Sequence, residues 1–155
     1  MRIPGWRHTR SILCSLSLVL TGVLLMSSFM NAADDIDYEA LRRSTTSEMQ
    51  KGNFKVAYES FRKLTLDPDN EPLRVGHDLY QAVNCLNRLG RTQEFDELIE
   101  AAIKVHSGNW RVLRSASQSY RSINHTGVIV GGEFQRGHNR GGGRYANAYE
   151  RDRVR

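Results

Sequence analysis

The sequence predicts an all-α protein in which about five helices pair into antiparallel hairpins. Between residues 37 and 122, apolar side chains recur at steps of three and four, the spacing of one buried face of an amphipathic helix. Short stretches rich in Gly, Asn, Asp or Pro separate these periodic segments. The segments have similar lengths, and a glycine lies at each internal turn, which indicates repeated helical hairpins.

Residues 1–33 have the three-part layout of a secretory signal peptide. A basic start with three arginines precedes an apolar run over residues 12–26, and small and polar residues then end in Ala32-Ala33. An uncleaved membrane anchor is the alternative, because residues 11–30 approach the roughly 20 residues that cross a bilayer. We therefore expect an exported protein, periplasmic or secreted, that contacts the membrane only if this leader is not removed.

The first two helices of the predicted helical-repeat domain, residues 34–123, lie on either side of Gly52-Asn53. The first covers residues 37–51 and follows an acidic stretch, which favours a helix N-terminus. The second ends at Leu66-Asp67-Pro68. Its expected buried face consists of Phe54, Ala57, Tyr58, Phe61 and Leu64.

Three more helices are predicted between residues 72 and 122. Pro72 suits a first helical turn, and Gly90 is placed to end that helix in the left-handed conformation. Thr92 is a candidate N-cap for the next helix, which Ser107-Gly108-Asn109 closes. The fifth helix is expected from Trp110 to Ser122. Its predicted buried side carries Trp110, Leu113, Ala116 and Tyr120.

The composition changes after Asn124. Seven glycines between residues 127 and 143 make a continuous helix unfavourable, at roughly 1 kcal/mol per glycine. We interpret residues 124–144 as a Gly/Arg-rich loop, within which residues 128–130 suit a short extended piece. Residues 145–155 are predicted to start a truncated helix.

Charge is unevenly distributed along the chain. The whole sequence has 22 basic and 17 acidic residues, and three of the arginines lie in the leader, so the mature chain carries 19 against 17. Residues 111–155 hold nine arginines and three acids, which leaves about −4 for residues 33–110. Cys85 is the one cysteine outside the leader, so we expect no intramolecular disulfide and a buried structural thiol.

The turn residues and helix faces resemble the tetratricopeptide repeat. Gly52, Ala57, Phe61 and Pro68 have the spacing of the second half of such a repeat, and Gly90 marks the turn of a second unit. The two glycines lie 38 residues apart instead of about 34. An ordinary helical bundle with the same apolar stripes is the alternative.

Several short motifs also resemble the helical region that precedes the macroglobulin domains of large exported bacterial alpha-2-macroglobulin-like proteins. The motifs are YESFRKL at residues 58–64, Asn109-Trp110, GEFQRGH at 132–138, RGGGRY at 140–145 and YERDRVR at 149–155. The resemblance spans about residues 38–155. It implies a leading scaffold that contacts downstream macroglobulin domains, in an apparently truncated copy. The Cys-Gly-Glu-Gln thioester motif of that family is absent from the sequence, so protease trapping is not assigned to these residues.

No catalytic, cofactor-binding or metal-binding residues are predicted. The four histidines of the mature chain lack the spacing of a ligand set, and phosphate-loop and nucleophile-elbow motifs are absent. The best candidate for a contact surface is the Gly/Arg-rich segment, because arginine forks suit carboxylates and phosphates. Its candidate residues, for an anion, for the acidic part of the same chain or for a neighbouring domain, are Arg136, His138, Arg140 and Arg144.

The sequence therefore favours an exported, non-enzymatic scaffold that binds a protein or peptide partner, because stacked helical hairpins usually work through such contacts. Its structural residues are Gly52, Ala57, Phe61, Pro68, Gly90 and Trp110. The alternative is a small envelope protein that binds polyanions through its Arg/Gly-rich tail. Nucleic acid is not an expected partner, because an exported protein rarely meets it.

Overall fold

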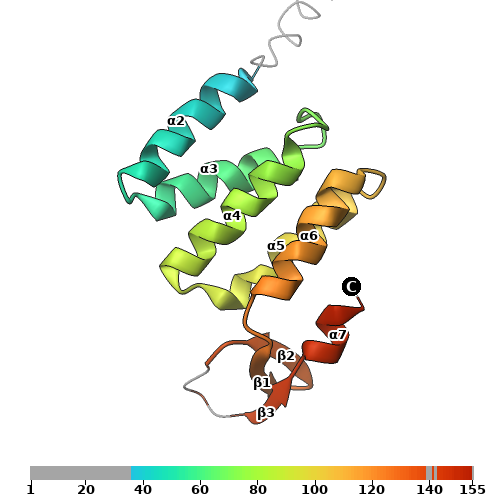
Figure 1. Cartoon of the computed structure of the whole chain (residues 1–155). Coiled ribbons are helices and arrows are strands. Elements are labelled where there is room, and N and C mark those ends of the chain that lie inside the picture. The colour runs from blue at the N-terminus through green and yellow to red at the C-terminus, as the bar shows by residue number, and fades with distance from the viewer. Residues whose placement is uncertain (1–35, 139–140, 142, 155) are drawn as a thin grey trace, which may run out of the picture. The chain divides into compact units, whose positions relative to one another are not determined.

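The computed structural model describes residues 36–138, 141 and 143–154. The chain separates into the units Met1–Ile36 and Asp37–Arg155, and the second contains every element described here (Figure 1). The predicted signal peptide and Arg140 lie outside the described residues. In chain order the elements are α2 (Tyr38–Gln50), α3 (Phe54–Leu66), α4 (Val75–Leu89), the 3-10 helix η1 (Thr92–Glu94), α5 (Phe95–Val105), α6 (Trp110–Ser122), β1 (Thr126–Val130), β2 (Glu133–Arg136), β3 (Arg144–Asn147) and α7 (Tyr149–Arg153).

The helix boundaries follow local capping chemistry. Asp37 caps α2 by accepting a hydrogen bond of 2.8 Å from a backbone N–H of the first turn. Gly90 ends α4 with a φ of 67°, as predicted, because this left-handed conformation is unfavourable for a side chain with a Cβ. Two expected start signals are wrong: Pro72 lies in the turn before α4, and Thr92 begins η1 instead of capping α5.

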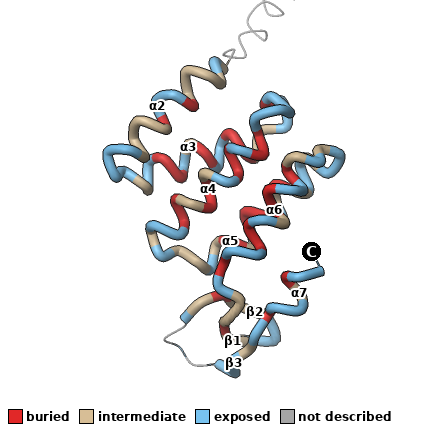
Figure 2. Tube along the Cα trace, in the orientation of Figure 1, coloured by how far each residue is buried: buried red, intermediate tan, exposed pale blue. Residues whose placement is uncertain are grey.

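Helices α3 to α6 form one hydrophobic core, and Figure 2 shows that buried positions recur along these helices. Helix α2 packs against this core through the partly buried side chains Tyr38, Leu41 and Met49. Helix α3 contacts both α2 and α4, and α4 also packs against α6. A fully buried Leu, Ile or Phe side chain contributes roughly 1.5–3 kcal/mol relative to an exposed one. The core includes Ala57, Phe61, Leu79, Leu86, Phe95, Ile99, Val112 and Tyr120, each at most 1% exposed. The prediction of a mostly helical protein is therefore confirmed.

The buried face of α6 differs from the predicted one. Trp110 is 57% and Leu113 is 41% exposed, whereas Val112 is fully buried. Two buried serines lie on the true inner face, and the Ser119 hydroxyl donates a 2.8 Å hydrogen bond to the Ser115 carbonyl. Because this bond satisfies a polar group inside the core, the helix can turn a serine inward and leave its tryptophan outside.

A three-stranded antiparallel sheet occupies most of the segment predicted as a loop. The strand order is β2-β1-β3, and Val130 of β1 pairs with Glu133 of β2. Only Gly131 and Gly132 separate these partners, with φ angles of 60° and 90°. Two positive φ angles define the tight turn that matches the twist of a hairpin. Gly131 and Gly132, which disfavour a helix, therefore form a β-turn. The predicted all-α fold class is incomplete, because the protein also contains this sheet.

The predicted C-terminal helix is also corrected. Tyr145 belongs to β3, where it pairs with Val128, and α7 covers only Tyr149–Arg153. This short helix is joined to the rest of the unit through Asp152, whose side chain is fully buried.

Candidate functional site

Three adjoining hollows follow α2, α4 and α6, and we call them together the helical groove. The first, of about 350 Å³, lies between α2 and α4 and shares His77 with the second. The second, of about 390 Å³, lies between α4 and α6 and shares Tyr80 with the third. The third, of about 480 Å³, lies between α4 and the facing ends of α2 and α3, and shares Gln50 with the first. The shared residues show that the three hollows adjoin one another along α4.

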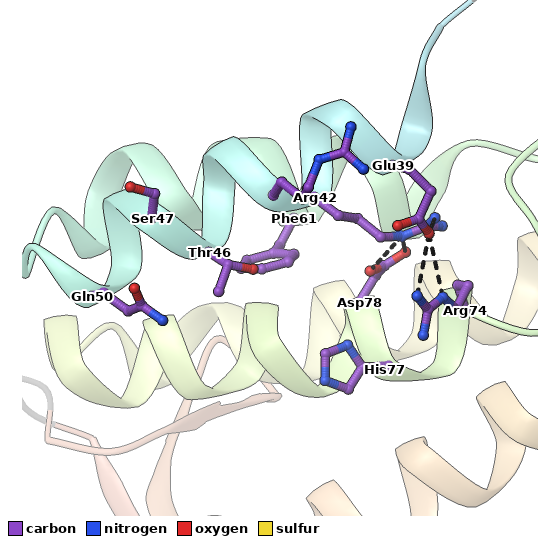
Figure 3. Close-up of a pocket in the computed structure, with 10 residues that line it drawn as sticks. Glu39, Arg42, Thr46, Ser47, Gln50, Phe61, Arg74, His77 and Asp78 are labelled. Atoms are coloured by element: carbon purple, nitrogen blue, oxygen red, sulfur yellow. Dashed lines mark hydrogen bonds and ion pairs between the residues drawn. The ribbon is translucent and has the colours of Figure 1, made fainter.

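Arg42 fixes the end of the groove between α2 and α4. Its Nε donates to both carboxylate oxygens of Asp78 at 3.1 Å, as Figure 3 shows. Asp78 is fully buried, and it also accepts a 3.0 Å hydrogen bond from Asn70. Breaking a buried charge pair on one side costs several kcal/mol, so this network holds α2 against α4. Arg42 is consequently a structural residue whose guanidinium is already satisfied.

Glu39 closes the same end from α2. It pairs with Arg42 at 2.9 Å and with Arg74 at 3.3 Å (Figure 3). Desolvation raises the pKa of Glu39, but the hydrogen bonds from both arginines outweigh it, so the pKa lies below its ordinary value. The carboxylate is therefore ionised at neutral pH, and its charge is paired with Arg42 and Arg74.

The hollow between α4 and α6 depends on a glycine. A Cβ built on Gly76 would lie 2.7 Å from the carbonyl oxygen of Arg111, so only glycine lets α4 approach the first turn of α6 this closely. Three large apolar side chains line this hollow and remain about half exposed: Leu73 at 59%, Tyr80 at 50% and Trp110 at 57%. Such a cluster of exposed apolar and aromatic side chains is typical of a contact surface.

Two arginines flank these apolar side chains. The Arg111 guanidinium lies over the Trp110 ring at 4.5 Å from its centroid, a cation–π contact. Arg114 follows one helical turn later and is exposed. Within the described part of the chain, neither Arg111 nor Arg114 forms an ion pair, and no Asp or Glu lines this hollow. Both guanidinium groups are therefore available to a carboxylate from outside.

The groove is more basic than the helical part of the chain as a whole. Six arginines and two carboxylates line its three hollows, whereas residues 33–122 hold 13 basic and 14 acidic residues. The balancing acids lie elsewhere: a hollow beside α3 and α5 is lined by three glutamates and two arginines. Folding therefore separates a cationic groove from an acidic surface along α3 and α5.

The residues predicted to define the repeat occupy distinct places. Gly52 makes the turn between α2 and α3 with a φ of 87°, and Ala57 is fully buried. Phe61 is buried and also borders the hollow between α2 and α4. Pro68 lies in the turn after α3. Trp110 is the exception, because it lines the groove instead of the core.

The four predicted tail residues do not form one exposed surface. Arg136 is buried, and its guanidinium donates to Asp96 of α5 at 2.8 Å and to Asp152 of α7 at 2.9 Å. His138 and Arg144 are exposed, while Arg140 lies outside the described residues. Arg136 thus anchors the sheet to α5 and α7 and is not accessible to a polyanion.

Asp152 is the centre of this buried cluster. Burial raises its pKa, but hydrogen bonds from Arg136 and His125 outweigh that effect and place the pKa below its ordinary value of 3.8. His125 Nδ1 lies 2.8 Å from the carboxylate, and the Tyr149 ring packs edge-on against the imidazole. Since its hydrogen bonds come from three segments of the chain, the carboxylate acts as a structural anchor.

Other reactive groups are few in the described residues. No group of three His, Cys, Asp or Glu side chains there is arranged to hold a metal ion. Cys85 is fully buried, and burial raises the pKa of its thiol. Among the described helices, none is both long and apolar enough to span a bilayer.

The sequence alone does not distinguish the groove arginines from ordinary surface charge. Arg43 and Arg114 are exposed and Arg111 is partly exposed, as charged residues on an amphipathic helix usually are. The composition of α6 does indicate a basic contact surface. This helix contains an aromatic residue and two nearby arginines but no acid, whereas α5 has three acids and one lysine. Comparisons with protein-family models, curated proteins and solved structures gave no match.

Proposed function

We propose that the protein is an exported, non-enzymatic scaffold whose helical groove holds an extended segment of a partner protein. The observation that carries this proposal is the hollow between α4 and α6. There, three half-exposed apolar side chains lie beside two arginines that have no ion-pair partner among the described residues. Apolar and aromatic side chains supply most of the binding energy at protein interfaces, and Trp, Tyr and Arg are the residues that most often dominate it.

The groove is also preorganised. Its helices are held by the Arg42–Asp78 pair on one side and by the close contact of Gly76 with α6 on the other. A rigid groove saves a binding partner the entropic cost of ordering loops, which is an advantage of helical scaffolds. Binding of a partner segment is the activity proposed for this groove.

Export is proposed from the leader, and the resemblance to macroglobulin-like proteins suggests one kind of partner. In such a protein the leading helical region would contact neighbouring domains of the same chain. A partner presented in trans would use the same groove. Both cases require the groove to bind a protein segment, so one experiment addresses them together.

The test compares Trp110→Ala with Leu113→Ala. Both residues lie on α6 and are exposed, but only Trp110 lines the groove. Protein purified after expression of the full chain is screened on an array of random-sequence peptides, and the bound peptides are titrated in solution. We expect Trp110→Ala to weaken binding about tenfold or more and Leu113→Ala to change it less than about threefold. Equal effects of the two variants, or no bound peptide at all, would contradict the proposal.

A further inference from the structure

The charges of the helical groove identify the chemistry of its occupant. We infer that the groove takes an extended peptide segment in which acidic side chains lie next to an apolar or aromatic one. This inference rests on the proposed function and specifies its ligand. It follows from three properties of the described residues: unpaired guanidinium groups, exposed apolar side chains beside them, and amide side chains along the groove.

The first property is a set of groove arginines that have no carboxylate partner among the described residues. Arg42 and Arg74 already have carboxylate partners in the groove, whereas Arg43, Arg111 and Arg114 have none within the described part of the chain. A guanidinium binds a carboxylate through two parallel N–H to O hydrogen bonds, and these charge-assisted bonds are about twice as strong as neutral ones. The hollow between α4 and α6 has no acid of its own to compete for them.

The second property is the set of apolar side chains that lines the same hollow as Arg111 and Arg114. Trp110 lies under Arg111, and Leu73 and Tyr80 form the opposite side of the same hollow. An aromatic or aliphatic side chain of the ligand inserted here would remove apolar surface from water and exclude solvent from the neighbouring ion pair. Excluding water strengthens a charge pair that would be weak on an open surface.

The third property favours a peptide over a sulfated or phosphorylated polymer. Gln50 and Gln118 line the groove with side chains that form no hydrogen bond among the described residues. An amide side chain offers both a donor and an acceptor, which matches the alternating N–H and C=O groups of an extended backbone. A polyanion offers acceptors almost exclusively, so it would leave the amide oxygens unpaired.

The experiment uses protein purified after expression of the full chain and an array of random-sequence peptides. Bound peptides should be enriched in Asp or Glu adjacent to Leu, Phe, Tyr or Trp. The tightest acidic binder is then synthesised together with a copy in which Gln and Asn replace Glu and Asp. We expect the neutral copy to bind about 10- to 100-fold more weakly.

The matching change in the protein is Arg111→Gln with Arg114→Gln. This double substitution should weaken binding of the acidic peptide by a similar factor. It should leave binding of the neutral copy nearly unchanged, because that peptide has no carboxylate to pair with the arginines. The control is Arg62→Gln with Lys63→Gln, which removes the same charge from exposed positions of α3 outside the groove. This control should change the affinity less than about threefold.

The possible outcomes distinguish failure of the inferred ligand chemistry from failure of the proposed function. If the bound peptides are not enriched in acidic residues but their binding is lost in Trp110→Ala, the inference is overturned and the scaffold proposal stands. Heparin that competes as well as the acidic peptide and shows the same loss in the Arg111 and Arg114 variant would also overturn it, since the groove would then accept polyanions in general. No binding to any peptide would overturn both.

Discussion

Gly76 decides how closely α4 can approach α6. Any added Cβ would meet the backbone of Arg111, which cannot move without displacing the first turn of α6. We expect Gly76→Ala to lower the free energy of unfolding by about 1–3 kcal/mol, measured by urea denaturation. Gly108→Ala is the control, because a Cβ there meets nothing within 4 Å. Equal stabilities of the two variants would show that α6 can shift at little cost.

Asp152 gives the protein a pH-dependent anchor. Its pKa is lower in the folded chain than its ordinary value of 3.8, so its ionised form stabilises the fold above that pH and the contribution is lost as the pH falls further. We expect Asp152→Asn to cost about 3 kcal/mol at neutral pH, and this difference from the wild type should shrink below pH 3.8. Urea denaturation across a pH series measures it, with exposed Asp69→Asn as the control. A difference that stays constant down to pH 2 would contradict the role of the charge.

The hairpin of β1 and β2 depends on Gly131-Gly132. Asparagine tolerates positive φ angles, so Gly131→Asn should change the midpoint of thermal unfolding little. A β-branched residue does not, and Gly132→Val should destabilise the protein by about 1–2 kcal/mol. Circular dichroism on heating measures both changes. If Gly132→Val were as stable as the wild type, the turn geometry would have to be different.

The helices were predictable because their apolar residues repeat at helical spacing. The extended piece expected at residues 128–130 is confirmed as part of β1. Its pairing with β2 and β3 was not predicted, although Val128-Ile129-Val130 followed by Gly131-Gly132 is a hairpin signal, because a glycine-rich stretch is equally typical of a loop. The orientation of α6 about its axis was not predicted, because the Ser119 hydroxyl donates to the backbone carbonyl of Ser115 and so allows a polar residue on the inner face. The groove required three helices to come together, and no short segment of sequence contains it.

The shared core predicts that the helices α2 to α6 unfold as one cooperative unit. Cys85 is part of that core and is the one cysteine after residue 33. Its thiol should therefore react with a thiol reagent about a thousandfold or more slowly than in the denatured chain. The urea dependence of this reaction should follow that of Trp110 fluorescence, which reports from the groove. A thiol that reacts long before the fluorescence changes would indicate separate unfolding of α4.

Arg136 also has a consequence for the order of folding events. It pairs with Asp96, 40 residues earlier in the chain, and with Asp152, 16 residues later. The pair that holds α2 against α4 spans a similar distance, because Arg42 and Asp78 are 36 residues apart, so loop length does not order the two events. Chain order does: every residue that lines the groove precedes Arg136, so these helices emerge first during synthesis. Until Arg136 docks, Asp96 on α5 lacks this partner, and the growing chain can contain the groove helices while the sheet is still unanchored.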